Sequence, residues 1–227
     1  MTFLTIGHRG VMGVEPENTL RSYLRAERSG MDVIALDLRL SKDGTLVALH
    51  DPEVGRTTDG SGAVADLTLA ELRELDAGQG ERVPVFEEVL DAVRSPLQVS
   101  VRDRAAVGVL AELLLRRDLT GRVEVASPDA ALLAETARLV PGVRTALRAD
   151  SPGGEVIARA LDAGAATLSV DVRRLTLEAV EEAHAAGLRI VGEEVDTLDL
   201  LRLARALGLD GAVTGFPEVR STGRFTA

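Results

Sequence analysis

Three short segments near the start of this 227-residue chain carry side chains that could handle a phosphate group. His8 and Arg9 follow the first apolar run, Asp37 and Arg39 lie late in the next, and His50 follows a third. Two histidines that face one substrate form a natural acid–base pair at neutral pH, because one can accept a proton while the other donates one. The planar guanidinium of Arg9 suits phosphate oxygens. This combination favours a site that cleaves phosphodiesters.

Each of these residues also has a structural alternative. A histidine can simply hydrogen-bond loop backbone, Arg9 can form an ion pair with Glu15 or Glu17, and Arg39 can be paired near its strand end. In the phosphate-site interpretation, Glu17 orients Arg9 or takes part in metal binding. Asp37 is then a ligand for a hard cation or a partner of Arg9.

The elements that must position these side chains follow an alternating pattern. Residues 2–6 and 33–40 are predicted strands, and residues 17–30 between them a helix with Asn18 as N-cap and Gly30 as C-cap. Residues 45–50 form a further extended segment. Residues 51–82 are rich in turn residues and are interpreted as an insertion with one short helix at 69–75.

From residue 86 onward the alternation of helix and strand resumes, which gives about eight strands in all. Strand–helix alternation indicates a parallel sheet, and eight units in this length predict an α/β fold of the (β/α)8 TIM-type barrel class with a small insertion after the second strand. One domain would span residues 1–227, and a doubly wound open sheet is the alternative. Chemistry in a barrel sits where the strands end, so the segments around His8, Asp37 and His50 should converge at one mouth.

Composition narrows the function further. The net charge of -10 argues against a general nucleic-acid or anionic-membrane surface, so an anionic substrate must be captured by clustered arginines. The absence of cysteine excludes disulfides, thiolate metal sites and a cysteine nucleophile. The start of the chain lacks a long apolar segment, and no run is long enough for a membrane span, which predicts a soluble cytoplasmic protein.

Several motifs resemble those of the glycerophosphodiester phosphodiesterase family. They are "HRG", "PENT", "LDLRLSKDGTLVALHD" and "RTTDGSGAVADLTLAELRELDAG", and the later "AHAAGLRI" and "GLDGAVTGFPE" extend the resemblance over nearly the whole chain. The resemblance implies a TIM-type barrel that uses a divalent cation, Mg²⁺ or Ca²⁺, to hydrolyse glycerophosphodiesters to glycerol 3-phosphate and an alcohol. It matches His8 and His50 to the catalytic pair, Arg9 to the phosphate-binding arginine and Glu17 to the PENT glutamate.

The chain departs from this family pattern at the implied metal ligands. The second strand usually carries Glu-x-Asp, and here Ala35 replaces the glutamate while Asp37 is retained. The third strand of the barrel usually carries Glu-x-Lys, and here Ser100 and Arg102 stand at those positions. The phosphate-binding charge is therefore kept by Arg102, whereas two expected carboxylate ligands are missing.

Three interpretations follow from these departures. The protein can be a phosphodiesterase in which Arg9, Arg39 and Arg102 supply the charge of the cation. Alternatively, Glu193 can reach into the barrel and restore a displaced cation site, unless it pairs with a neighbouring arginine. In the third interpretation the chain binds a phosphorylated ligand without turning it over. The expected partner is a small glycerophosphodiester or glycerol phosphate, and the sequence does not indicate an oligomeric state.

Overall fold

Eight strands with buried, mostly apolar side chains close into a parallel barrel in the computed structural model, which describes residues 3–221. Each strand pairs with its neighbour, and β1 pairs with both β2 and β9, which completes the ring. The predicted (β/α)8 barrel is confirmed, and the open-sheet alternative is wrong. The barrel strands are β1 (Leu4–Gly7), β2 (Val33–Leu40), β4 (Leu97–Val101), β5 (Val123–Ser127), β6 (Arg144–Ala149), β7 (Thr167–Asp171), β8 (Arg189–Glu193) and β9 (Gly211–Thr214).

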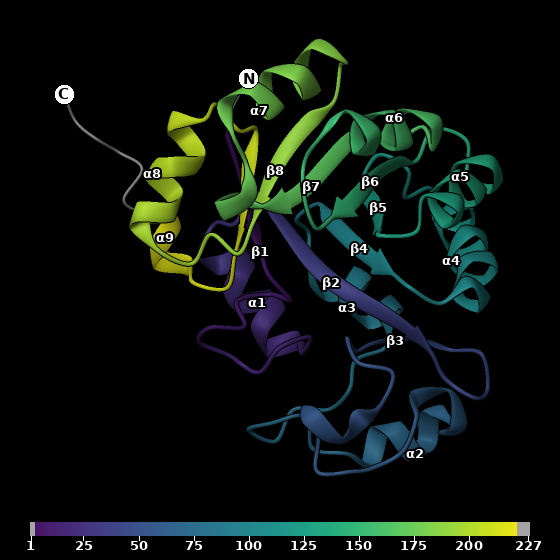
Figure 1. Cartoon of the computed structure of the whole chain (residues 1–227). Helices are drawn as coiled ribbons and strands as arrows, with labels where there is room; N and C mark the ends of the chain where they lie inside the picture. Colours follow the sequence, from purple (N-terminus) through teal and green to yellow (C-terminus); the bar gives the residue numbers. More distant parts are fainter. Residues whose placement is uncertain (1–2, 222–227) are drawn as a thin grey trace.

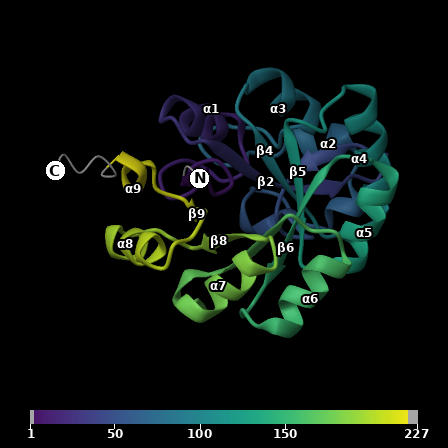
Figure 2. The same ribbon diagram turned by 90° about the horizontal axis from the view of Figure 1, so that it is seen from above.

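Helices connect these strands and form an outer layer around the barrel, as Figure 2 shows from above. No helix within residues 3–221 combines the length and the apolar character that crossing a bilayer requires. The helices are α1 (Leu20–Arg28), α3 (Phe86–Ala92), α4 (Arg104–Arg116), α5 (Ala130–Leu139), α6 (Gly154–Asp162), α7 (Leu177–Ala185), α8 (Leu198–Ala206) and the short α9 (Pro217–Ser221), with a 3-10 turn η3 (Val172–Arg174) after β7.

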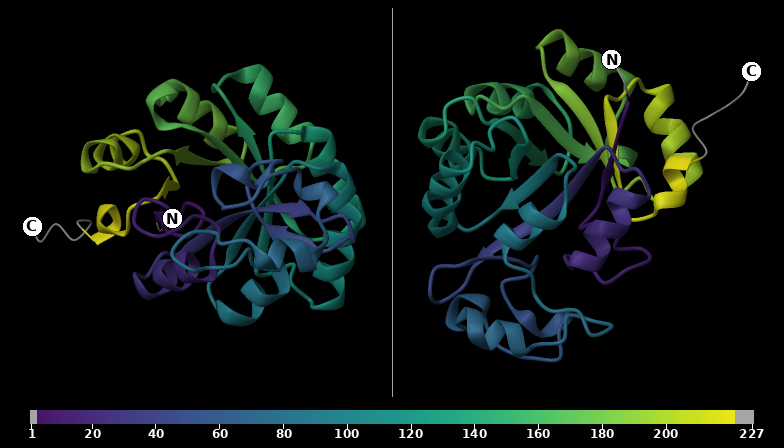
Figure 3. Two further views of the ribbon diagram at one scale, coloured as in Figure 1. Left: turned by 90° about the horizontal axis from the view of Figure 1, so that it is seen from below. Right: turned by 180° about the vertical axis from the view of Figure 1, so that it is seen from behind.

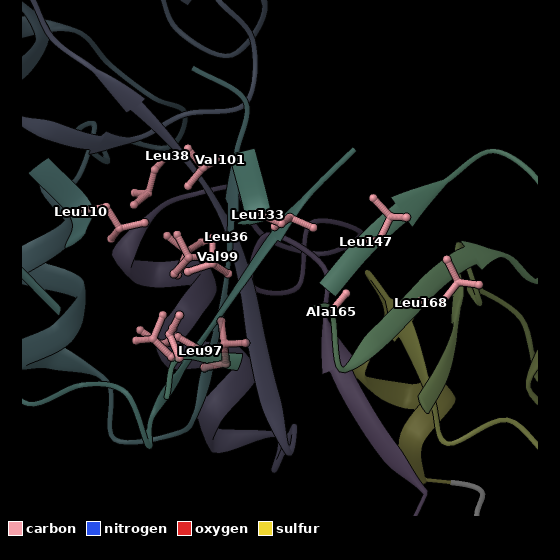
Figure 4. Packing of buried hydrophobic residues seen from close by; sticks show 14 of the residues in the cluster. Leu36, Leu38, Leu97, Val99, Val101, Leu110, Leu133, Leu147, Ala165 and Leu168 are labelled. Carbon is pink, nitrogen blue, oxygen red and sulfur yellow. The ribbon is translucent and has the colours of Figure 1, made fainter. Parts of the chain in front are cut away.

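Side chains alternate along the strands, so that mostly apolar ones point outward while the inward ones include small, polar and a few apolar residues. Leu36 and Leu38 of β2 pair in register with Val99 and Val101 of β4, and these four pack beneath the helices near Leu110 of α4 (Figure 4). The inside of the barrel holds a second, smaller apolar cluster of Ile6, Ala35, Val191 and Val213. Because side chains on a strand alternate between faces, Asp37 shares the inward face with Ala35, two residues nearer the carboxyl end.

The insertion follows a short strand that pairs with the end of β2 outside the closed barrel. This strand, β3 (Leu46–Ala48), pairs with β2 in antiparallel register and is followed by η1 (Val54–Arg56), η2 (Val64–Asp66) and α2 (Leu69–Glu74). The short helix predicted at residues 69–75 is therefore confirmed and ends one residue earlier. The segment lies beyond the end of β2 (Figure 1, Figure 3). Its own small core contains Val47, Leu49, Val54, Val64, Leu72, Ala77 and Val83.

The predicted caps of the first helix are each displaced by one residue. Thr19 is the N-cap, and its hydroxyl accepts a hydrogen bond from Ser22 N, while Ser29 is the C-cap and Gly30 follows it at φ 76°. Asn18 has a left-handed φ of 55°. The N-cap prediction for Asn18 was wrong because this side chain is used inside the barrel, where it binds Asp37.

Candidate active site

A cavity of about 410 Å³ opens at the carboxyl ends of the barrel strands. This volume is within the usual range for a small-molecule site. Four of the predicted site residues, His8, Arg9, His50 and Arg102, contribute to its wall, together with residues from the ends of β5 to β8, which include the predicted Glu193. These last residues are Pro128, Arg148, Ala149, Asp150, Ser169, Asp171, Arg174, Glu193 and Glu194.

The turn that carries His8 and Arg9 is held in an unusual backbone conformation. Arg9 has φ 49° and Gly10 has φ 85°, both in the left-handed region that glycine tolerates best. A Cβ atom on Gly10 would lie 2.7 Å from the Cβ of Ser22, so helix α1 also requires glycine here. His8 N donates to Thr214 O at 2.8 Å, and Arg9 O accepts from Ser22 Oγ at 3.0 Å. The strained turn is thus fixed from both sides.

Arg9 lies between two carboxylates. Its Nη1 donates to Glu17 Oε1 at 2.7 Å, and its Nε is 3.1 Å from Asp37 Oδ2. Burial by itself would raise the pKa of Asp37, but the charges of Arg9 and Arg148 outweigh burial and hold this pKa below its ordinary value. Asp37 is therefore an ionised partner of Arg9, which was one of the two roles predicted for it.

Asn18 and Tyr23 form a buried support beneath this ion pair. Asn18 Nδ2 donates to Asp37 Oδ2 at 3.2 Å, and Asn18 Oδ1 accepts from Asp37 N at 3.2 Å and from the Tyr23 hydroxyl at 2.9 Å. Tyr23 is fully buried, and burial raises the pKa of its hydroxyl well above the ordinary value. The hydroxyl therefore stays protonated and fixes the orientation of the Asn18 amide.

His50 is oriented through its side chain by the insertion. Its Nδ1 lies 2.6 Å from Asp51 Oδ1, and Arg56 of η1 binds the other oxygen of Asp51. Hydrogen bonds from Arg56 and His50 hold the pKa of Asp51 well below its ordinary value. Since an ionised Asp51 accepts the proton on Nδ1, the Nε2 atom of His50 is left to face a substrate. Arg56 also donates to both carboxylate oxygens of Glu17, at 2.9 and 2.7 Å.

The backbone of His50 is held by Arg39. Arg39 Nε and Nη2 donate to His50 O at 3.0 and 2.7 Å, and Nη1 donates to Asp103 Oδ1 at 2.7 Å. These contacts agree with the alternative that Arg39 is paired structurally near the end of its strand. Its contact with phosphate stays a prediction.

The two histidines differ in their surroundings. Burial lowers the pKa of His8, and the neighbouring charges of Arg9 and Arg148 lower it further, while Glu193 partly opposes them. His8 is therefore neutral at pH 7, in the form that accepts a proton. His50 instead has the carboxylate of Asp51 against its ring, with Asp51 Oδ1 2.6 Å from Nδ1.

Arg148, which none of the sequence motifs indicated, lines the cavity near the end of β6. Its Nε lies 3.2 Å from Glu193 Oε1 on β8, and its Nη1 donates a long hydrogen bond of 3.4 Å to Ser100 Oγ on β4. Glu193, predicted as a substitute cation ligand or as the partner of an arginine, forms an ion pair with this arginine. A polar side chain at the carboxyl end of a barrel strand was the signal that could have identified Arg148.

Three carboxylates proposed as cation ligands, those of Glu17, Asp37 and Glu193, are each paired with an arginine. Arg9 contacts both Asp37 and Glu17, and Arg148 contacts Glu193. In the described part of the chain, no group of three or more His, Asp or Glu side chains is placed to hold a metal ion. Hard divalent cations take six to eight oxygen ligands in the case of Ca²⁺ and near-octahedral oxygen ligands in the case of Mg²⁺. The donors present do not fit a divalent cation.

The fold and the cavity together define a class: a TIM-barrel protein whose cavity is lined by two histidines and several arginines. The sequence profile of the glycerophosphoryl diester phosphodiesterase family matches residues 8–219. The chain belongs to this family, as its motifs predicted.

Relatives and solved structures agree with this assignment over almost the full length. The glycerophosphodiester phosphodiesterase of Caldanaerobacter subterraneus subsp. tengcongensis is 32% identical, with 96% of each chain covered. That of Bacillus subtilis is 30% identical over 95% of this chain and 84% of the relative. The structure of an Oleispira antarctica phosphodiesterase, in complex with the product sn-glycerol-3-phosphate, superposes with a TM-score of 0.90 at 26% identity, covering 96% of this chain and 95% of the other.

Proposed function

We propose that this protein hydrolyses glycerophosphodiesters to glycerol 3-phosphate and an alcohol, with His8 and His50 as the acid–base pair. The observation that carries the proposal is that both histidines line one cavity together with Arg9 and Arg102. Family membership and the product-bound Oleispira structure support the substrate class. Arg9 and Arg102 bind the phosphoryl oxygens, because guanidinium groups present paired donors to them.

The environments of the two histidines support a division of roles. Neutral His8 accepts a proton from the water molecule whose oxygen attacks phosphorus and forms the new bond to it. The bond between phosphorus and the leaving alcohol breaks, and His50, oriented by Asp51, donates a proton to the departing oxygen. The barrel and the insertion, residues 51–82, act as one domain in this scheme, since Arg56 of the insertion contacts Glu17 and Asp51 beside the cavity.

The test is release of glycerol 3-phosphate from glycerophosphocholine, followed with a coupled dehydrogenase. We expect turnover by the wild type and a loss of roughly 10²- to 10⁴-fold in His8→Gln and in His50→Gln, the usual contribution of an acid–base group. His184→Gln is the matched control, because His184 is exposed on α7 and its Nε2 contacts Asp210 at 2.9 Å. Unchanged turnover in both cavity variants would refute the assigned roles.

A second candidate function is binding of a phosphorylated ligand without turnover. It is favoured by Ala35 and Ser100, which provide no carboxylate where the family pattern implies metal ligands, and by the pairing of Asp37 with Arg9. Calorimetry with glycerol 3-phosphate separates the two functions. Binding that Arg9→Ala abolishes, combined with undetectable turnover of several glycerophosphodiesters with and without Mg²⁺ or Ca²⁺, would establish the binding protein.

A further inference from the structure

Arg148 is a cation held in the cavity by few contacts. Its side chain is 16% exposed, and within residues 3–221 the single hydrogen bond that it donates is the long one to Ser100. Its Nε atom is buried beside Glu193 Oε1, yet neither atom has a partner in hydrogen-bond geometry. A guanidinium group carries five N–H donors, so most of those of Arg148 remain available to a ligand.

Small side chains allow Arg148 to reach across the barrel. Ser100 of β4 pairs in register with Ala126 of β5, which pairs with Ala146 of β6, so alanine lies between the strand of Arg148 and its contact on β4. On its other side, Ser100 is the register partner of Asp37 on β2. The guanidinium of Arg148 is thereby brought toward the ion pair of Asp37.

The charge of Arg148 acts on the groups assigned to catalysis. It is among the causes that hold the pKa of His8 and the pKa of Asp37 below their ordinary values. These effects place the guanidinium within electrostatic range of the proton-accepting histidine and of the Arg9–Asp37 pair. A phosphoryl group bound by Arg9 beside His8 would therefore lie in the field of Arg148 as well.

We propose that Arg148 binds the phosphoryl group together with Arg9 and supplies the positive charge that the family otherwise obtains from a divalent cation. The inference rests on the proposed function for its chemistry. It uses a group that is charged at every working pH and that presents paired donors to phosphate oxygens. The carboxylate of Glu193 lies 3.2 Å from the Nε atom of Arg148, so it faces this guanidinium rather than a metal ion.

Calorimetric titration with glycerol 3-phosphate tests this role without requiring turnover. We expect the same Kd after EDTA treatment and after addition of excess Mg²⁺ or Ca²⁺. Arg148→Gln should weaken binding by roughly 10- to 100-fold, the range for hydrogen bonds to a charged group. Arg144→Gln is the matched control, since Arg144 begins the same strand and is exposed at the opposite end of the barrel. It should bind like the wild type.

Two results would overturn the inference. One is a Kd that weakens with EDTA and recovers with Ca²⁺ or Mg²⁺, and the other is wild-type affinity in a folded Arg148→Gln variant. Circular dichroism establishes folding. If this variant does not fold, Arg148→Lys retains the charge without the paired donors and should bind less tightly than the wild type.

A further variant separates the role of Glu193 from that of a metal ligand. Glu193→Gln removes a negative charge facing the bound anion, so binding of glycerol 3-phosphate should be retained or become tighter. Weaker binding that added Ca²⁺ restores would identify Glu193 as a metal ligand and would contradict the inference. If binding depends on Arg148 while the wild type shows no turnover, the proposed hydrolysis fails and this inference stands. If turnover needs His8 but not Arg148, the hydrolysis stands and this inference fails.

Discussion

Replacing Asp37 with asparagine would show whether this retained carboxylate serves a metal ion or Arg9. Asp37 is 6% exposed and has its Oδ2 atom 3.1 Å from Arg9 Nε and 3.2 Å from Asn18 Nδ2. Asparagine has nearly the same shape but no charge. The substitution therefore removes the electrostatic attraction while leaving the packing of the barrel interior intact.

The expected loss of stability can be worked from these contacts. Removing one partner of a buried ion pair typically costs about 3–5 kcal/mol, because the other charge is left uncompensated. Arg9 keeps its 2.7 Å contact with Glu17, so its charge remains paired. We therefore expect a smaller loss, about 2 kcal/mol, which corresponds to a fall in Tm of about 4–8 °C for a chain of this size.

Thermal unfolding followed by circular dichroism in EDTA measures this difference, and its pH dependence identifies the cause. The pKa of Asp37 is lower in the folded protein than its ordinary value of 3.8. The carboxylate thus stabilises the fold fully above pH 3.8, and this contribution is lost as the pH falls through the lower folded value. The gap between wild type and Asp37→Asn should close in that window.

Binding of glycerol 3-phosphate supplies the refuting result. If Asp37 acts as the partner of Arg9, its neutralisation removes a charge that repels the phosphoryl group, and affinity in EDTA should be equal or higher. Two outcomes would refute the ion-pair assignment. One is a difference in stability between wild type and Asp37→Asn that does not change with pH. The other is a lower affinity in the variant than in the wild type, together with an affinity that Ca²⁺ raises in the wild type but not in the variant.

Three further substitutions test the supports of the site. In His8→Gln, stability should fall less as the pH drops below 6.5 than in the wild type, because the lowered pKa of His8 makes protonation favour the unfolded chain, and melts between about pH 5 and 7 measure this. Tyr23→Phe should cost about 1 kcal/mol in urea unfolding, since Asn18 keeps its other partners; no change would show that the hydroxyl bond is unimportant. Gly10→Ala should lower Tm far more than Gly44→Ala, which shares a positive φ but has open space around it; equal losses would count against the packing argument.

The sequence was sufficient for the barrel because its strands and helices differ in periodicity. Eight strands that alternate with helices along the chain leave few possible arrangements, of which the closed barrel is one, and the family motifs indicate the same barrel. The predicted cap at Asn18 failed for a reason that local sequence does not contain: its side chain binds Asp37, 19 residues further along the chain.

The cavity-lining residues that belong to family motifs, Arg102 among them, were predicted from the sequence, whereas Arg148 belongs to none of these motifs and was missed. His8, Arg9 and His50 belong to contiguous motifs, and all three line the cavity. Arg39 occupies the inward face as expected, but its partner Asp103 lies 64 residues away, so the motif could not show that it is engaged. Arg148 reaches its position only because Ser100 and Ala126 are small, and this depends on how the strands pair.

Arg56 joins the two histidine-bearing segments through a single side chain. It comes from the first turn of the insertion, yet it bridges Glu17 after the His8 turn and Asp51 beside His50. The insertion has its own small core, which can open as a separate cooperative unit. Such an opening would break both of the contacts that Arg56 makes, with Glu17 and with Asp51. Hydrogen exchange in the insertion should thus report how often the two histidine-bearing segments lose their link through Arg56.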